Sequence, residues 1–321
     1  MSNSNNFSVV ICAYTEKRWD NLVRGVESVK GQSLPPGEII VVVDHNETLF
    51  SQAKANLQGV KVIENNNSPG LSGARNSGIA AAQGEIIAFI DDDAFAEPDW
   101  LAQLREGYRE PNVQGVGGLI KPEWHSPRPK WFPGEFNWVV GCTYRGMPEK
   151  ASPVRNLIGC NMSLRREVFD TIGGFRIGRV GALSIGQEND ETEFCIRLQR
   201  LWPEATLLYR PEAMVHHEVT KERSTRNYYI RRCFSEGLSK ARLSKQVGLV
   251  KGTSTERRYV VKTLPASFLR ALAHSIRTFD FKALEQASAI LVGLASTVAG
   301  YLVGNLGQLN LNLLKKGQVA A

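Results

Sequence analysis

The sequence is poor in cysteine, and its cysteines follow no metal or redox motif. Five are present in 321 residues: Cys12, Cys142, Cys160, Cys195 and Cys233. Their odd number and the absence of Cys-x-x-Cys spacing argue against a disulfide framework and a structural zinc site. Residues 1–6 also lack the basic and then apolar pattern of a secretory signal. We therefore expect a protein of a reducing, cytoplasmic compartment.

Long uncharged segments are scarce as well, and one stands out. Ala287–Gly304 contains no charged residue, and as a helix it would be about 27 Å long, barely enough to cross a bilayer core. Its many small residues make it weakly hydrophobic, and an amphipathic segment, Ser267–Phe279, precedes it. We favour an interfacial or re-entrant membrane helix over a full span. A soluble oligomerisation helix is the third alternative, and the oligomeric state is open.

Positive charge is concentrated in one part of the chain. Residues 221–262 contain twelve Lys and Arg against three Glu, a net +9, so the remainder of a chain with net charge +7 is slightly acidic at −2. A basic block beside an acidic body favours contact with phosphates or with an anionic membrane surface. No nucleic-acid-binding motif accompanies the block, so we expect no nucleic-acid partner.

Apolar runs that alternate with helical patterns predict the fold. Strands are expected over 7–13, 38–43, 60–63 and 85–94, and helices over 19–30, 48–57, 71–83 and 98–108. This alternation is typical of an α/β fold with a doubly wound sheet. We expect residues 1–240 to form the catalytic domain, and 241–321 a basic linker followed by an apolar helical extension that associates with a membrane.

Polar residues follow three of these strands, at the edge where ligands bind in such sheets. They are Tyr14 and Glu16, Asp44, and the triplet Asp91-Asp92-Asp93. Three adjacent carboxylates repel one another unless a cation lies among them, and oxygen ligands suit Mg²⁺ or Mn²⁺. The triplet therefore indicates a metal-diphosphate site, and the alternative is an acidic capped turn.

Two further segments have unusual composition. Residues 121–155 combine six prolines with three tryptophans and two phenylalanines, which indicates either a lid or substrate platform, or a loop packed on the core. A strand is expected over 205–209, and His216-His217 follows it.

The ordered motifs resemble those of the family 2 glycosyltransferases, which have the nucleotide-diphospho-sugar (GT-A) fold. The resemblance covers roughly residues 7–200. It rests on Ala13-Tyr14-Thr15-Glu16, Gly73-Ala74-Arg75-Asn76-Ser77-Gly78, Ala82-Gln83-Gly84-Glu85, Asp91-Asp92-Asp93, Gly173-Gly174-Phe175, and Asp190-Glu191-Thr192-Glu193-Phe194 with Arg197.

The resemblance implies roles for individual residues. The nucleotide-sugar donor would be bound by Ala13, Tyr14, Glu16, Asp44, Arg75, Asp91 and Asp92, with Arg75 contacting the diphosphate or bracing the metal carboxylates. The metal ligands would be Asp93, Asp91 and His217. Asp92 is excluded from the metal because, on a strand, its side chain would point to the other face. Arg223 and Arg231-Arg232 resemble basic residues that clamp a diphosphate or a lipid phosphate.

The catalytic base is expected at the start of the helix near residue 190. Alignment through Arg197 favours Glu191, with Asp190 as the alternative and Glu188 the least favoured. A carboxylate there could deprotonate an acceptor hydroxyl in a single inverting displacement. The alternative is that these acids only begin an amphipathic helix at its positive end.

These observations predict an inverting, metal-dependent glycosyltransferase at the cytoplasmic face of a membrane. It would use a nucleotide-diphosphate sugar as donor and a glycan or lipid-linked sugar as acceptor. A sugar-phosphate nucleotidyltransferase is a competing hypothesis, but it would need a Gly-rich basic loop where Ala13-Tyr14-Thr15-Glu16 stands. A non-catalytic carbohydrate- or membrane-binding protein is the other, and loss of the metal or base carboxylates would be its mark.

Overall fold

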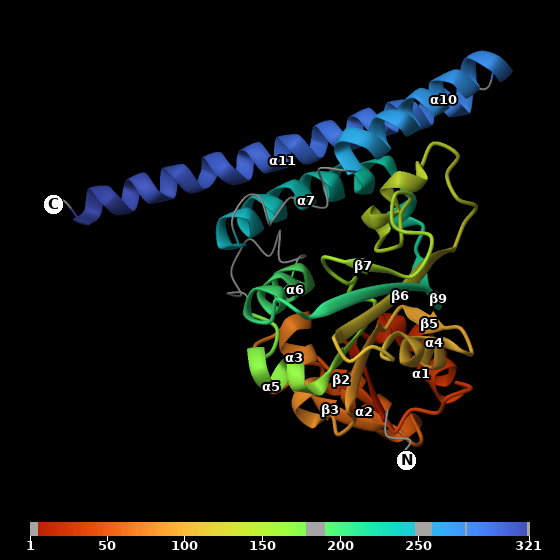
Figure 1. The fold of residues 1–321 in the computed structure, drawn as a ribbon, viewed down its shortest axis with the longest axis vertical. Helices are drawn as coiled ribbons and strands as arrows, with labels where there is room; N and C mark the ends of the chain where they lie inside the picture. Colours follow the sequence, from red (N-terminus) through yellow and green to blue (C-terminus); the bar gives the residue numbers. More distant parts are fainter. Residues whose placement is uncertain (1–5, 178–189, 248–258, 280, 320–321) are drawn as a thin grey trace.

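The computed structural model describes residues 6–177, 190–247, 259–279 and 281–319. Its centre is a mixed nine-stranded sheet in the order β3-β2-β1-β4-β8-β6-β9-β5, with β7 paired to β9 (Figure 1). The strands are β1 (Phe7–Ala13), β2 (Glu38–Val43), β3 (Lys61–Glu64), β4 (Ile86–Asp91), β5 (Ala94–Ala96), β6 (Val113–Trp124), β7 (Ser152–Val154), β8 (Asn161–Arg165) and β9 (Thr206–Val219).

The described helices follow the strands in the chain. They are η1 (Glu16–Arg18), α1 (Trp19–Lys30), α2 (Glu47–Asn56), α3 (Leu71–Ala81), α4 (Trp100–Gly107), η2 (Gly134–Val140), α5 (Arg166–Ile172), α6 (Asp190–Leu201), η3 (Glu222–Ser224), α7 (Arg226–Val247), η4 (Tyr259–Thr263), α10 (Leu264–Thr278) and α11 (Phe281–Val319).

Helices cover both faces of the sheet, because alternate side chains of its central strands point to opposite sides. On β1, Val9 and Ile11 pack into the same core as α1, α2 and α4. Val10 points the other way, into a core that includes residues of α3, α5 and α6. This double coverage explains why the parallel strands β1, β2 and β4 are continuous apolar runs. The expected α/β fold with a doubly wound sheet is thus observed.

The predicted strand 205–209 is only the first part of a longer one. β9 continues to Val219, so His216 and His217 lie within the strand and not after it. The strand pattern of β9 is interrupted between Arg210 and Met214, where the register of its pairing with β6 shifts. The segment between them contains Pro211, which has no N–H to donate to a ladder.

Only the first aspartate of the triplet, Asp91, lies on a strand, as the last residue of β4, and Asp92 and Asp93 form a tight turn between β4 and β5. β5 pairs antiparallel with β9, and Ala94 stands opposite His217. Asp93, one residue before β5, is thereby placed beside the histidine. The alternation argument for Asp92 therefore does not apply, since Asp92 and Asp93 follow the end of β4 at Asp91.

The aromatic segment 121–155 is largely packed on the core. Phe132 and Phe136 are fully buried, and both rings contact Tyr229 of α7, at centroid separations of 5.5 and 5.4 Å. This corresponds to the packed-loop alternative for these two residues. The segment joins the sheet to the C-terminal helices.

Three helices form a layer on top of the sheet domain. α7 lies between the sheet and α11, and α10 packs along α11 (Figure 1). Small residues make the α7–α11 contact close: a Cβ at Gly237 would collide with the carbonyl oxygen of Thr297, and one at Gly300 with that of Phe234. The predicted division of the chain at residue 240 falls inside α7 and stays a prediction.

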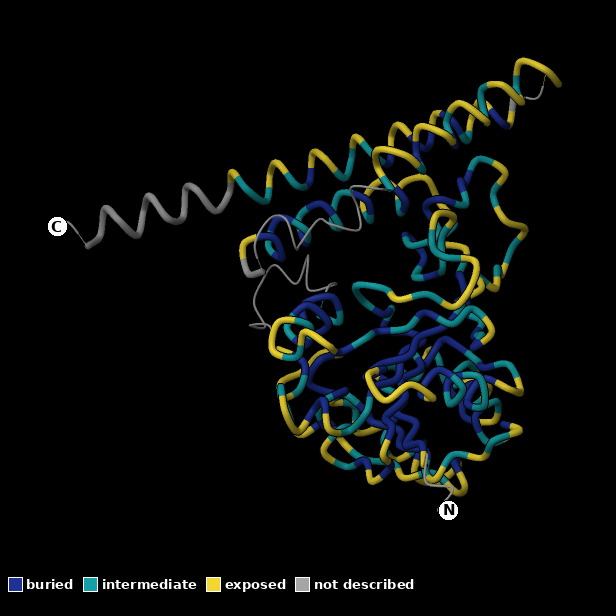
Figure 2. The backbone as a smooth tube through the Cα atoms, in the orientation of Figure 1, coloured by how far each residue is buried: buried dark blue, intermediate teal, exposed yellow. Residues whose placement is uncertain are grey.

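One described helix could cross a membrane by length and composition. It comprises Lys282–Leu306 of α11, and 28% of its apolar window is buried inside the protein. Figure 2 shows exposed residues along α10 and α11, above a mostly buried sheet. Of the exposed large apolar side chains in the described part of the chain, all but four lie between residues 230 and 306.

Candidate active site

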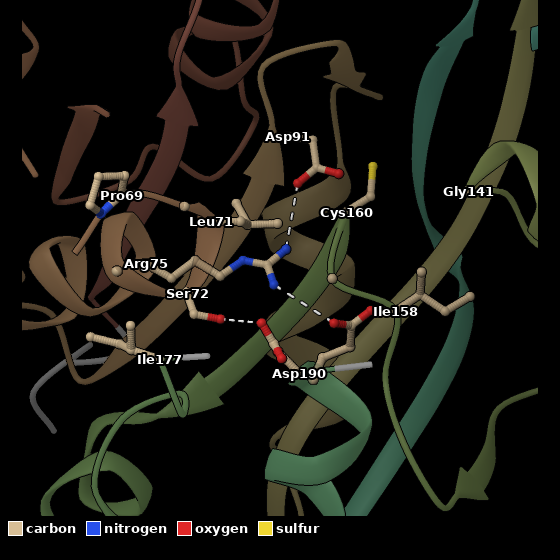
Figure 3. Close-up of a pocket in the computed structure, with 14 residues that line it drawn as sticks. Pro69, Leu71, Ser72, Arg75, Asp91, Gly141, Ile158, Cys160, Ile177 and Asp190 are labelled. Carbon is tan, nitrogen blue, oxygen red and sulfur yellow. Dashed lines mark hydrogen bonds and ion pairs between the residues drawn. The ribbon is translucent and has the colours of Figure 1, made fainter. Parts of the chain in front are cut away.

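A cleft formed by two adjoining pockets lies at the carboxyl ends of the parallel strands. The two pockets share Gly70, Leu71 and Asp91. The pocket of about 360 Å³ reaches Ala13, Tyr14 and Asp44. The one of about 330 Å³ reaches Asp190 (Figure 3) and Glu191. The end of β4 therefore lies between the predicted nucleotide residues and the predicted base.

At the end of the cleft where the nucleotide is predicted to bind, hydrogen bonds fix the side chain of Asp44. Its carboxylate accepts from Asn65 Nδ2 at 2.6 Å and from the backbone N–H of Gly70 at 2.8 Å, and contacts His45 Nδ1 at 2.9 Å. Burial would raise the pKa of Asp44, but these hydrogen bonds hold it below its usual value. The carboxylate is therefore ionised and fixed in orientation at neutral pH.

The other residues predicted at this end differ in position. Ala13 and Tyr14 line the pocket, and the Tyr14 side chain is 54% exposed, so its ring is available for contact with a ligand. Glu16 is not among the lining residues. It accepts a hydrogen bond from Asn46 Nδ2 at 3.1 Å, and Asn46 caps the N-terminus of α2 through Leu49 N.

The turn after β4 carries two buried carboxylates with cationic partners. Arg18 Nη1 lies 2.7 Å from Asp92 Oδ1 and 3.2 Å from Asp93 Oδ2. Asp93 also pairs with His217 Nε2 at 3.2 Å and Arg223 Nη2 at 3.6 Å. The second oxygen of Asp92 is buried without a hydrogen-bond partner. The mutual repulsion expected of the triplet is therefore relieved by cationic side chains of this protein.

Their different partners separate the pKa values of the two carboxyl groups. Burial raises the pKa of Asp92 to about 7, opposed by Arg18. For Asp93, burial acts in the same direction, but the hydrogen bond with His217 and the charges of His217, Arg18 and Arg223 hold its pKa well below the usual range. Burial would lower the pKa of His217, yet hydrogen bonds with Asp93 and Cys142 raise it to about 10.

Among the described residues, one group of side chains could hold a cation. Ligand atoms of Asp91, Cys160 and His217 lie within 4.8 Å of one another. A carboxylate and an imidazole suit Mn²⁺, and the carboxylate suits Mg²⁺. Burial and nearby carboxylates raise the pKa of the Cys160 thiol well above its usual range, so it stays protonated and is no ligand for a hard ion. Two of the three predicted ligands, Asp91 and His217, lie in this group, and a cation bound there would have to displace the proton that His217 shares with Asp93. Asp93 lies outside this group and stays a prediction.

Arg75 lies between Asp91 and the predicted base. It is 3% exposed, with Nη2 3.6 Å from Asp91 (Figure 3) and Nη1 3.9 Å from Glu191. Gly159 makes room for it, because a Cβ there would collide with the guanidinium. This geometry corresponds to the bracing role that was predicted for Arg75.

Asp190 and Glu191 begin α6 and face the same pocket. Asp190 accepts a hydrogen bond from the Ser72 hydroxyl of α3. The Glu191 side chain is 21% exposed and points toward Arg75. Burial raises the pKa of both acids, although Arg75 acts against it. Glu193 instead turns away to pair with Arg197 at 3.2 Å. Glu188 lies outside the described residues.

Arg18, Cys160 and Ser72 line the cleft and had no role predicted from the sequence. Arg18 follows Lys17 at the start of a helix and belongs to no motif. Ser72 precedes the motif Gly73–Gly78, and Cys160 is one of five cysteines that follow no metal-binding pattern. The sequence signal that could have found Arg18 is its position, one short turn after the first strand, where Tyr14 and Glu16 already pointed to a ligand.

The sheet and the position of the cleft are those of a GT-A-type nucleotide-sugar transferase fold, and two solved structures have the same fold. The mannosyltransferase PcManGT from Pyrobaculum calidifontis, in complex with GDP-Man and Mn²⁺, matches with a TM-score of 0.55 and 15% identity, over 92% of this chain and 88% of that one. GalNAc-T7 with UDP, GalNAc and Mn²⁺ matches with a TM-score of 0.52 and 17% identity, over 86% and 58%.

The family is shown by sequence. The model described as Glycosyl transferase family 2 matches residues 8–173. A Haloferax volcanii protein named glucosyl-dolichyl phosphate glucuronosyltransferase is 33% identical over 93% of this chain and 96% of its own length. Succinoglycan biosynthesis protein ExoM of Rhizobium meliloti is 24% identical over 74% and 75%. This chain belongs to glycosyl transferase family 2, and it is a glycosyltransferase with a GT-A fold, as the motifs predicted.

Proposed function

We propose that this glycosyltransferase is inverting and metal-dependent, and that its acceptor is a sugar linked to an isoprenoid phosphate at a membrane surface. The observation that carries the proposal is the continuous cleft. Asp44 and Tyr14 line one end of it, Glu191 and Asp190 the other, and Asp91 lies where the two pockets meet. The name of the Haloferax relative supports a dolichyl-phosphate-linked acceptor. The cytoplasmic side of the membrane stays a prediction.

The donor would lie across the end of β4. Asp44 and the Tyr14 ring would contact the ribose and base, since a fixed carboxylate accepts hydrogen bonds from hydroxyl and N–H groups. Arg18 and Arg223, which line the same pocket, would face the diphosphate. A divalent cation held by Asp91 and His217, with Asp93 as the third candidate ligand, would neutralise the departing diphosphate.

Glu191 would act as the base. Its carboxylate takes the proton of the acceptor hydroxyl as that oxygen attacks the anomeric carbon, and the bond from this carbon to the diphosphate oxygen breaks in the same step. One displacement inverts the anomeric configuration. Arg75 keeps Glu191 oriented beside Asp91, and the raised pKa of Glu191 makes it a stronger base than an exposed glutamate.

Family membership disfavours the two competing hypotheses. A nucleotidyltransferase would need a basic Gly-rich loop after β1, but the one arginine there, Arg18, is paired with Asp92 and Asp93. A non-catalytic protein would be expected to have lost the metal or base carboxylates, and both sets are retained.

The proposal is tested by transfer of labelled sugar from a panel of nucleotide sugars, with Mn²⁺ or with EDTA. Glu191→Gln should lower kcat by about 10²–10⁴-fold, and Asp91→Asn and Asp93→Ala should lower activity and Mn²⁺ affinity. Glu167→Gln, an exposed position of α5, is the matched control and should behave as wild type. NMR of the product gives the anomeric configuration.

Separate outcomes would reject separate parts. Equal activity in all variants would reject the mechanism, and full activity in EDTA would reject the metal. A product with retained configuration would reject the single displacement. Loss of the base function in Asp190→Asn, but not in Glu191→Gln, would transfer the role to Asp190.

A further inference from the structure

A second groove lies away from the cleft, between the N-terminal turns of α7 and the first part of α11. Its volume is about 430 Å³. The lining is mostly apolar: Trp131, Tyr229, Ile230, Leu284, Ala289 and Val292. On α11 it extends from Leu284 to Val292, about 12 Å along the helix axis. Two small residues, Ser288 and Ala289, complete the lining on α11. These dimensions suit a narrow hydrocarbon chain.

The groove has one cationic group at its side. Arg226 lies 5.5 Å from the centre of the Trp131 ring and pairs with Glu285 at 2.9 Å. Both side chains of this pair are half or more exposed, so the pair is weak and its cation is available to a stronger anion. An apolar groove with an arginine at its edge is complementary to a lipid phosphate and the chain attached to it.

The groove is directly connected to the active site along the chain. Arg223 lines the donor pocket, with its Nη2 atom 3.6 Å from Asp93. Arg226 follows three residues later, so the Cα atoms of the two arginines lie at most about 10 Å apart. The aromatic segment makes a second link, because Trp131 lines the groove whereas Gly141 lines the pocket of Glu191. A lipid phosphate near Arg226 would therefore hold its sugar within reach of the cleft.

The groove also opens onto the most apolar surface of the protein. Ile230, Leu284 and Val292 are each between 42 and 43% exposed. They continue into the exposed side of the α11 segment that is long and apolar enough to cross a membrane. A chain bound here could therefore pass from a bilayer to the protein without crossing a polar surface, a transfer that the hydrophobic effect favours.

We infer that this groove binds the isoprenoid chain next to the phosphate of the lipid-linked acceptor, with Arg226 at that phosphate. The inference rests on the proposed function for the identity of the acceptor. Trp131 and Tyr229 form the rigid aromatic wall, supported by the fully buried Phe132 and Phe136. Arg226 exchanges Glu285 for the phosphate when the lipid binds.

The test compares two substitutions of the same kind on one helix. Val292 lies in the groove and Val298 outside it, and they are 42% and 48% exposed. Val292→Trp should fill the groove, whereas Val298→Trp should leave it open. Full-length protein in detergent is assayed with two acceptors that carry the same sugar phosphate, one on a dolichyl-length chain and one on a single isoprene unit. Donor hydrolysis without acceptor is the shared reference.

We expect Val292→Trp to raise the KM for the long-chain acceptor at least tenfold. Its kcat/KM for the short-chain acceptor and its donor hydrolysis should stay within twofold of wild type, and Val298→Trp should leave all three unchanged. Equal loss for both acceptors, or equal effects of the two variants, would overturn the inference. The inference would also be overturned if Val292→Trp changed only the binding of the protein to vesicles, which would indicate that bulk lipid occupies the groove. A change only in the mass of the oligomer would indicate that a second copy of the chain occupies it.

A binding measurement separates this inference from the proposed function. A fluorescent isoprenyl phosphate is titrated into each protein without donor, and Val292→Trp should weaken its binding at least tenfold. Suppose that wild type transferred sugar to no lipid-linked acceptor but still bound the isoprenyl phosphate more tightly than Val292→Trp did. The proposed acceptor would then be wrong, and the assignment of the groove would stand. If binding were equal in wild type and Val292→Trp, the groove assignment would be wrong whatever the acceptor.

Discussion

At the scale of single residues, the cleft depends on how buried charges are paired. Asp92 and Asp93 are 3% and 6% exposed, and burial of two adjacent carboxylates is costly unless cations lie beside them. Arg18, His217 and Arg223 provide those cations from two distant parts of the chain, the turn after β1 and the end of β9 with the turn that follows it. The three consecutive aspartates therefore supply only the negative charges of the cleft, and the cations that balance them come from elsewhere in the chain.

Arg18→Met should consequently impair both stability and donor binding. It leaves Asp92 without its one ion pair and Asp93 with two of its three partners, so we expect a loss of about 1–3 kcal/mol in the free energy of unfolding. Urea denaturation measures the loss, and the KM for the donor should rise in parallel. Lys17→Met, at the exposed neighbouring position, is the control; a similar loss there would contradict the role of Arg18.

The pH dependence of kcat should report Glu191. Burial raises its folded-state pKa, so the base is protonated at a higher pH than an exposed glutamate would be. Activity should therefore fall as pH is lowered through this raised pKa, and the acidic limb should lie above the value of about 4.3 for an ordinary glutamate. Glu191→Gln should abolish the limb. A limb that remained in this variant would assign it to another group.

At the scale of elements, one side chain holds the irregular part of the sheet together. Asn161 Nδ2 donates to the carbonyls of Leu119 and Ala213 at 3.0 and 2.9 Å, and its Oδ1 accepts from Trp100 Nε1 at 2.8 Å. These bonds satisfy carbonyls at the register shift between β6 and β9. The Asn161 amide thus supports the path of β9 toward His217, together with the pairing of β9 with β5, β6 and β7.

Asn161→Asp is nearly isosteric but removes both N–H donors. Two buried carbonyls would then face a carboxylate, and we expect the free energy of unfolding to fall by about 2–6 kcal/mol, since each buried unsatisfied group costs about 1–3 kcal/mol. Thermal unfolding measures it, and Asn112→Asp, whose bond to Thr206 is exposed, is the control. Equal melting temperatures for the two variants would contradict this account.

The contact between α7 and α11 should tolerate no added side chain. At Gly300 a Cβ would collide with the backbone carbonyl of Phe234, and backbone cannot yield as a flexible side chain can. We expect Gly300→Leu to lower stability by about 1–3 kcal/mol, the usual cost of overpacking. Ala299→Leu, at the exposed neighbouring position, should have little effect in the same thermal-shift assay. The reverse order would mean that the two helices do not pack in this way.

Local patterns predicted the sheet domain well, because its signals lie within short segments. The buried strands β1, β2 and β4 are continuous apolar runs. Of the polar residues at their ends, Tyr14, Asp44 and Asp91–Asp93 line one pocket, whereas Glu16 does not. The full length of β9 was missed because Pro211 and the register shift interrupt its pattern. Arg18 was missed because its partners are about seventy residues away, and a distant ion pair leaves no trace in local sequence.

At the scale of the whole molecule, the exposed apolar side chains are gathered on the C-terminal layer. The apolar character of 287–304 could be read from composition, but its packing against α7 could not, since that contact joins segments about sixty residues apart. With α7 packed along one side of α11, the apolar surface that is open to lipid consists of the exposed side of α11, α10 and the edge of the groove at Ile230.

This asymmetry predicts binding to vesicles through α10 and α11. Leu302→Glu, at a position 56% exposed on α11, should weaken sedimentation with phosphatidylglycerol vesicles, whereas Leu201→Glu, 65% exposed on α6, should not. High salt should weaken binding further, because the basic residues of α7 and α10 act by screened charge. Equal binding of the two variants would place the lipid contact elsewhere.

The short segment from His217 to Arg226 has a thermodynamic consequence. It carries a proposed metal ligand, an arginine of the donor pocket and the arginine of the second groove, in that order along the chain. If donor binding orders this segment, part of the entropic cost of fixing Arg226 has been met before the lipid arrives. Linkage then requires that lipid tightens donor binding by the same factor as donor tightens lipid binding. The enzyme would thus hold its nucleotide sugar most firmly at the bilayer, where the acceptor is found.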